Sequence, residues 1–87
     1  MTADRRSEPR LPAQGAVWVC ETAEGGVELE GELVDRSPEG FRVAFRQTAP
    51  SSGASVEFRM EDCSGLAVAM WTRRAGTRVE CGFHIHG

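Results

Sequence analysis

A polar hexapeptide holds the residues of this sequence that are best suited to contact a ligand. It runs from Asp35 to Gly40 and places the carboxylate of Asp35 two residues before the hydroxyl of Ser37. Both side chains can bond the backbone of a turn, Pro38 fixes φ, and Gly40 allows φ > 0. An ordinary turn is therefore one interpretation. Because a hairpin needs only two such residues, six polar positions also predict hydrogen-bonding groups that a rigid sheet holds out to a ligand.

Three arginines lie upstream of the hexapeptide, in a stretch with very few apolar residues. Arg5, Arg6 and Arg10 concentrate positive charge in residues 1–12. An arginine fork matches paired acceptor atoms, such as phosphate oxygens, bidentately, and a lysine ammonium does not. The composition predicts that residues 1–12 form a flexible basic arm and that residues 13–87 form the folded domain. A solvated basic tail that binds nothing is the alternative.

Alternation of apolar and polar residues predicts a strand on each side of the hexapeptide, at residues 27–34 and 41–45. Gly31 is the expected site of a β-bulge in the first of these. Four further strands are expected at residues 16–21, 56–61, 66–71 and 79–85. The strand at residues 66–71 is apolar on both faces, so we expect both of its faces to be covered.

Closely spaced short strands separated by turn signals favour a small antiparallel barrel, because a closed barrel has no exposed sheet edge. No stretch has helical periodicity over a useful length. The 87 residues are enough for one domain with a thin core. The expected fold class is therefore all-β, a six-stranded antiparallel barrel with a flexible N-terminal arm.

Charge and hydropathy exclude several classes of protein. A formal net charge of −3 argues against general DNA or RNA binding, which needs a basic surface. No apolar run is long enough to span a bilayer, and the N-terminus lacks the apolar segment of a signal peptide, so we expect a cytoplasmic protein without membrane insertion. Three cysteines without C-x-x-C spacing predict reduced thiols rather than a disulfide framework.

The sequence gives little support to a metal site or to catalysis. Cys63, Cys81, His84 and His86 are metal-ligand types, but in a strand Cys81 would face inward and the two histidines outward. No nucleophile is paired with a base in a known catalytic motif, so we expect no enzyme activity. Trp18 and Trp71 are expected to pack against the barrel rather than to stack on a base.

The arm and the hexapeptide carry two motifs in a defined order. R-x-x-x-R, from Arg6 to Arg10, precedes the first strand, and D-x-S-x-x-G, from Asp35 to Gly40, joins the second strand to the third. With six strands around them, these motifs resemble a PilZ domain. The resemblance runs from about Arg5 to Ile85 and includes the Trp71 to Arg73 segment and the pair Gly82 and Phe83. It implies a barrel that binds the bacterial second messenger cyclic di-GMP.

The resemblance also implies which residues hold the ligand. Arginine forks match phosphate oxygens and the O6/N7 edge of guanine, and a carboxylate accepts from its N1 and N2 donors. Arg36 would add a cation, whereas Glu39 stands where many family members have glycine and could repel phosphate. The residues expected at the site are Arg5, Arg6, Arg10, Asp35, Ser37 and Gly40, with Arg36 as an accessory contact.

The function implied is that of a receptor or effector without catalysis and without a further cofactor. Its arm would become ordered on cyclic di-GMP and so change what the barrel presents to a partner protein in a bacterial signalling pathway. The alternative is a protein-interaction module of the same fold that does not bind nucleotide.

Overall fold

The computed structural model describes residues 11–12, 14–23 and 26–86. Within these ranges all regular structure is β-strand, and no helix is long and apolar enough to cross a membrane. The strands are β1 (Leu11–Pro12), β2 (Ala16–Glu21), β3 (Glu28–Ser37), β4 (Gly40–Phe45), β5 (Ser55–Arg59), β6 (Ser64–Ala75) and β7 (Arg78–Ile85).

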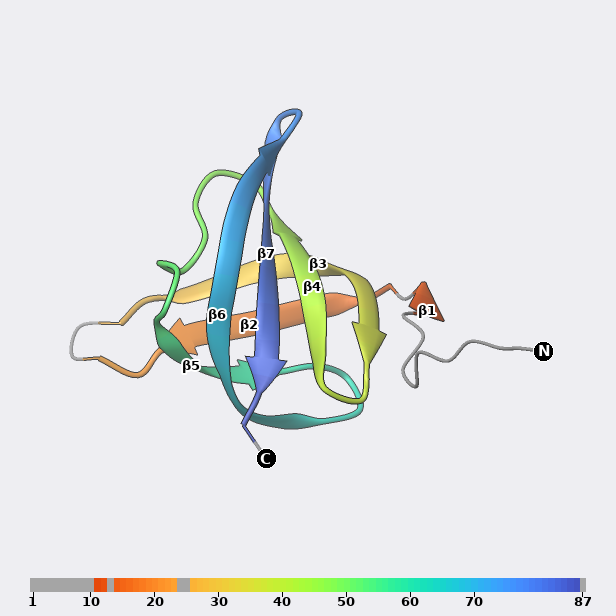
Figure 1. The fold of residues 1–87 in the computed structure, drawn as a ribbon, viewed down its shortest axis with the longest axis vertical. Coiled ribbons are helices and arrows are strands. Elements are labelled where there is room, and N and C mark those ends of the chain that lie inside the picture. Colours follow the sequence, from red (N-terminus) through yellow and green to blue (C-terminus); the bar gives the residue numbers. More distant parts are fainter. Residues whose placement is uncertain (1–10, 13, 24–25, 87) are drawn as a thin grey trace.

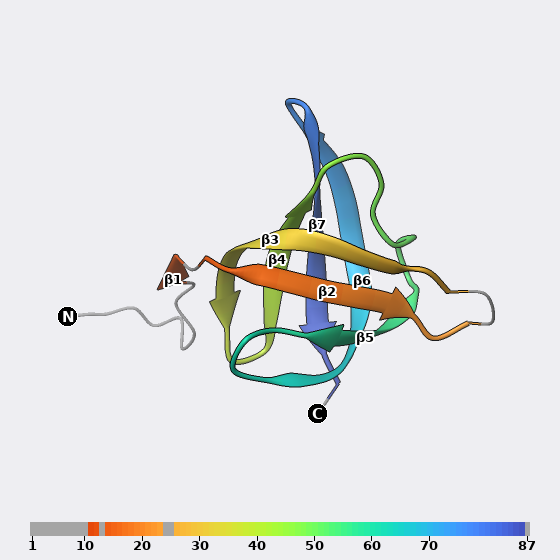
Figure 2. The ribbon, with the colours of Figure 1, turned by 180° about the vertical axis from the view of Figure 1, so that it is seen from behind.

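Six of the strands close into a barrel. They pair in the order β3, β2, β5, β6, β7 and β4, and β4 pairs again with β3, with every pair antiparallel. The strands β4, β7 and β6 run side by side and cross the direction of β2, β3 and β5, and the β6–β7 hairpin projects beyond the barrel (Figures 1 and 2). The all-β, six-stranded antiparallel barrel expected from the sequence is confirmed. Residues 1–10 of the expected arm lie outside the described residues.

The barrel interior is filled by one apolar cluster with aromatic rings at its centre. The ring of Phe41 stacks on Phe83 at a centroid distance of 5.0 Å and meets Phe58 at 4.8 Å. Such aromatic pairs add stability beyond that of the buried area. Strands with one polar face supply most of the core because alternate side chains point inward. The cluster comprises Val17, Val19, Leu33, Phe41, Val43, Phe45, Val56, Phe58, Met60, Ala67, Ala69, Cys81 and Phe83.

The prediction that the whole hexapeptide forms a turn is wrong. The strand β3 continues through Ser37, and β4 starts at Gly40, so only Pro38 and Glu39 form the connection. Two-residue connections are typical of antiparallel hairpins. Asp35, Arg36 and Ser37 are therefore held by strand pairing, which fixes their direction more firmly than a loop would.

The expected roles of two glycines also need correction. Gly40 is not among the glycines with positive φ. Its hydrogen in place of a side chain instead lets β4 approach β7, because a Cβ at this position would collide with the backbone carbonyl of Phe83. Gly31 does not mark a bulge, since it pairs regularly with Val17, and a Cβ there would lie 2.5 Å from the Val43 side chain. Both glycines serve close packing rather than an unusual backbone conformation.

The strand β6 is longer and more exposed than expected. It extends to Ala75, beyond the expected end at residue 71, and its outward side chains are uncovered: Leu66 is 50% exposed and Met70 56% exposed. Val27, the first residue of the strand expected at residues 27–34, precedes β3 and is also exposed. The expectation that both faces of the strand at residues 66–71 are covered is therefore wrong, although both faces carry apolar residues.

Candidate functional site

A β-bulge turns Asp35 toward the outside of the barrel. Leu33 pairs with Val43 and Asp35 pairs with Arg42, so Val34 is the additional residue on β3. Without the bulge, Asp35 would share the inner face with Leu33, two residues earlier. With the bulge, it lies on the outer face beside Arg42, and its carboxylate accepts a hydrogen bond from an Nη of Arg42.

The Asp35–Arg42 ion pair is partly withdrawn from solvent. Asp35 is only 8% exposed, and the Arg42 side chain is 29% exposed. The hydrogen bond to Asp35 raises the pKa of the Arg42 guanidinium, and the charges of Asp35 and Glu80 act in the same direction, against the effect of burial. The buried Nε of Arg42 has no hydrogen-bond partner among the described residues. Buried donors normally have a partner, so this atom is an exception, and the exposed part of the guanidinium is the part that a ligand could contact.

The ion pair belongs to a row of residues that crosses four strands. Arg42 on β4 pairs with Gly82 on β7, and Gly82 pairs with Trp71 on β6. A Cβ at Gly82 would collide with the indole of Trp71, so the glycine lets the ring lie directly over β7. A second bulge, at Met70, changes the register of β6 just before Trp71. The indole is 38% exposed, and the Cζ of Arg73 lies 5.7 Å from its centroid.

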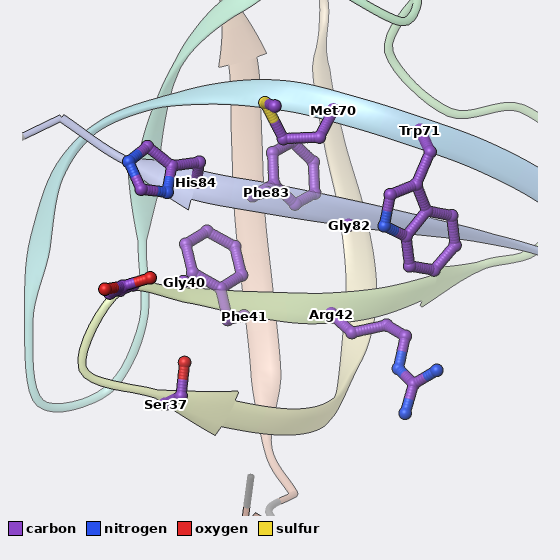
Figure 3. A pocket seen from close by; sticks show the side chains of 10 residues that line it. Ser37, Gly40, Phe41, Arg42, Met70, Trp71, Gly82, Phe83 and His84 are labelled. Atoms are coloured by element: carbon purple, nitrogen blue, oxygen red, sulfur yellow. The ribbon is translucent and has the colours of Figure 1, made fainter. Parts of the chain in front are cut away.

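The row borders an open pocket of about 360 Å³ on the outer face of β4, β6 and β7. Arg42 and Trp71 lie at one end of the pocket, and Ser37 and His84 lie toward the other end (Figure 3). The volume is at the lower end of the range for small-molecule sites. The lining residues are Ser37, Glu39, Gly40, Phe41, Arg42, Met70, Trp71, Gly82, Phe83 and His84.

Three residues of the D-x-S-x-x-G motif are brought together here. Ser37 and Gly40 line the pocket, and Asp35 reaches it through Arg42. A larger depression, of about 630 Å³, lies elsewhere on the barrel and includes the Arg78–Glu32 ion pair, but no motif residue lines it.

The structure does not bring Arg36 to this pocket. Its guanidinium donates to both carboxylate oxygens of Asp62 at 3.2 Å and lies 3.6 Å from the sulfur of Cys63. These groups belong to the β5–β6 connection, and Arg36 lines a different depression with Met60. Adjacent strand residues point to opposite faces, which separates Arg36 from its neighbours Asp35 and Ser37.

The arginines of the first motif lie outside the described residues, but the chain that follows them is described. The strand β1 begins directly after Arg10, and it pairs with β3 so that Leu11 lies opposite Arg36 and Pro12 opposite Asp35. The segment adjoining the R-x-x-x-R motif is thereby joined to the strand that carries the second motif.

Several pocket residues, among them Arg42, Trp71, Gly82 and His84, were not recognised from the sequence as site residues. Arg42, Gly82 and His84 enter through strand pairing, since β7 joins β4 only when the barrel closes. Trp71 was expected to pack, and it does lie over Gly82, but it also lines the pocket. The signal available in the sequence was the alternation after Gly40, which already placed Arg42 on an outer face.

Metal ligands do not gather in the described part of the chain. Cys81 is fully buried, His84 is exposed, and no group of three metal-ligating side chains occurs among the described residues. The three cysteines are free thiols.

Comparison with known proteins gives no family for this chain. A scan of the sequence against family models returned no match, and a search of curated proteins returned none. The PilZ resemblance therefore stays a prediction that rests on the motif residues and the barrel.

Proposed function

We propose that this chain is a receptor module for cyclic di-GMP that binds the nucleotide on the outer face of the barrel. The proposal is supported by the position of the second motif, whose Ser37 and Gly40 line a pocket beside the Asp35–Arg42 ion pair. The observation that carries it furthest is the pairing of β1 with β3 at Asp35 and Arg36. This pairing places the two residues that directly follow the first motif beside the strand that carries the second motif.

The residues provide the chemistry that a cyclic dinucleotide needs. Arg6 and Arg10 would bind phosphate oxygens or the O6/N7 edge of guanine through their planar forks. Ser37 can donate or accept a hydrogen bond, and the exposed face of Trp71 offers an area for stacking a base. Gly40 lines the pocket and has no side chain, so it puts no steric obstacle between β4 and a flat ligand.

Signalling would follow from ordering of the arm. Residues 1–12 have few apolar side chains to bury, whereas the nucleotide offers acceptors to their arginines. A bound arm would change the surface next to β3 that a partner protein meets. In this proposal the protein is an effector of a bacterial second messenger in the cytoplasm, with no catalytic step.

Titration calorimetry with cyclic di-GMP, and with GMP as the control ligand, tests the proposal. The wild-type protein should bind the cyclic dinucleotide and bind GMP much more weakly, since GMP lacks the second base and phosphate. Arg6→Ala and Arg10→Ala should each weaken binding by on the order of 1.5 to 3 kcal/mol, the cost of a lost charge-assisted contact. Arg59→Ala is the matched control, because Arg59 lies over Trp18, outside the pocket. If Arg6→Ala and Arg10→Ala both bound cyclic di-GMP with wild-type affinity, the arm would not be part of the binding site.

A protein-interaction barrel that binds no nucleotide is the second candidate. It is favoured by Glu39, whose carboxylate lines the pocket and would repel phosphate, and by the exposed apolar side chains of Leu66 and Met70. The same titration separates the two candidates. Absence of heat with cyclic di-GMP in a folded protein supports the interaction module.

A further inference from the structure

Arg42 is the cation that the barrel itself places at the pocket. The sequence has ten arginines and no lysine, and Arg42 is the arginine that lines the pocket as the structure describes it. The side chain is held in place by strand pairing on both sides of β4 and by its bond to Asp35. A cation with a fixed position costs less entropy to use in binding than one on a mobile segment.

The guanidinium has donor capacity that the barrel leaves unused. One Nη bonds Asp35, and the side chain is partly exposed where it lines the pocket. A guanidinium carries five N–H donors in a planar fork, so a bond to Asp35 leaves others for a second acceptor. Figure 3 shows the Arg42 side chain at the same end of the pocket as Trp71. An acceptor of a ligand in this end of the pocket would meet both side chains.

We propose that Arg42 is a further ligand-contacting residue of the nucleotide site: it holds Asp35 in place and donates from the exposed part of its guanidinium to an acceptor atom of cyclic di-GMP. This inference rests on the proposed function and adds a residue that neither motif contains. In this inference Asp35 acts through Arg42: the carboxylate holds the guanidinium in position, and the guanidinium donates to the ligand.

The substitution Arg42→Lys separates ligand contact from a purely structural role. Lysine keeps a cation near Asp35 and so preserves the ion pair, but it has neither a planar fork nor an Nε–H donor. We expect Arg42→Lys to melt close to the wild-type temperature while binding cyclic di-GMP about 10- to 100-fold more weakly. Arg78→Lys is the matched control, because Arg78 also forms a cross-strand ion pair, 2.9 Å from Glu32, outside the pocket. We expect Arg78→Lys to change neither the melting temperature nor the affinity for cyclic di-GMP.

A spectroscopic measurement on the wild-type protein complements the variants. The Nε–Hε resonance of Arg42, assigned from its loss in Arg42→Lys, should shift on addition of cyclic di-GMP, and that of Arg78 should stay in place. Wild-type affinity in Arg42→Lys, a parallel loss of stability and affinity, or an unmoved Arg42 resonance in the bound protein would each overturn the inference. If the wild type binds no cyclic di-GMP, the proposed function fails and the inference fails with it. If the wild type binds and Arg42→Lys binds equally well, only the inference fails.

Discussion

At the scale of single residues, the Asp35–Arg42 pair links the stability of the barrel to its proposed function. The carboxylate is mostly buried, and the guanidinium beside it is only partly exposed. Removing one member of such a pair leaves the other charge poorly solvated, which costs more than the pair itself contributes. The motif aspartate is thus expected to matter to the free protein as well as to the complex.

Asp35→Ala should therefore lower both affinity and stability. We expect a loss of about 1 to 3 kcal/mol in the free energy of unfolding, because Arg42 loses its acceptor. Urea denaturation and calorimetry with cyclic di-GMP measure the two effects. Asp62→Ala is the control, since the Asp62–Arg36 pair lies on the surface and should affect stability little. An Asp35→Ala protein as stable as the wild type would show that the pair does not support the fold.

Cys81 predicts an alkaline limit to stability. Burial raises the pKa of this thiol from 9.0 to about 12. Because the folded-state pKa is the higher one, the thiol's contribution to stability is complete below about pH 9 and is lost as the pH rises toward 12. The sequence has no tyrosine, and its basic residues are all arginines, so few other groups titrate in this window. Urea midpoints should fall between these pH values in the wild type and much less in Cys81→Ala. If the urea midpoint fell equally steeply with pH in the wild type and in Cys81→Ala, the prediction would be contradicted.

At the scale of elements, the site depends on how closely β4 and β7 approach. Gly40 pairs with His84, and Gly82 pairs with Arg42, so a glycine on each strand lies at the pocket. A side chain at Gly40 would collide with the backbone of β7 at Phe83. A side chain at Gly82 would collide with the indole of Trp71. The floor of the pocket is therefore a product of strand packing as much as of the motif.

Gly40→Ala should destabilise the barrel. The added methyl group would collide with the Phe83 carbonyl, and backbone cannot move aside as a flexible side chain can. We expect a loss of about 1 to 3 kcal/mol, measured by thermal unfolding. Gly65→Ala provides the control, because a Cβ there would lie 3.4 Å from the Phe58 ring, close to ordinary contact. If both variants unfolded at the wild-type temperature, the close approach of β4 and β7 would not constrain this position.

Strand positions were predictable from the sequence because inward and outward side chains alternate. The segments around Val17, Val43 and Phe83 were placed correctly, since in each the alternate apolar side chains belong to the core. The bulges at Val34 and Met70 were not predicted, because a regular alternation assumes an unbroken strand, whereas an additional residue shifts the alternation by one position.

The site was predictable only in the part that is local in sequence. Asp35, Ser37 and Gly40 were identified from one hexapeptide, and Ser37 and Gly40 line the pocket. Arg42 and Trp71 come together only through the β4–β7–β6 pairings, which depend on closure of the barrel. Arg36, expected as an accessory contact, lies away from this pocket, because it points to the opposite face of β3 from Asp35 and pairs with Asp62.

At the scale of the whole molecule, we expect the barrel to keep its structure on binding and the arm to be the part that responds. The backbone of most preorganised proteins moves by less than about 1 Å on binding, whereas polar segments pay their ordering cost at that moment. Residues 1–12 contain three of the ten arginines in a chain with net charge −3. Recognition of an anionic nucleotide would therefore depend on a basic segment in an otherwise acidic protein.

Ordering of the arm should be visible as a change in backbone dynamics. NMR relaxation should report higher amide order across residues 5–10 with cyclic di-GMP than without it, and little change in the strands. Affinity should fall as salt increases, because phosphates are being neutralised. An arm that is equally rigid in the free protein, or that stays mobile in the complex, would exclude ordering on binding.

The most direct test of the proposed function uses the two tryptophans as reporters on different faces. Trp71 lines the pocket, whereas Trp18 lines a separate depression on β2 with Arg59 over its ring. In a nitrogen–proton correlation spectrum, addition of excess cyclic di-GMP should shift the indole signal of Trp71 and the amide of Gly40 and leave the indole signal of Trp18 in place. Unchanged signals at Trp71 and Gly40, or shifts centred on Trp18, would contradict a cyclic di-GMP site at this pocket.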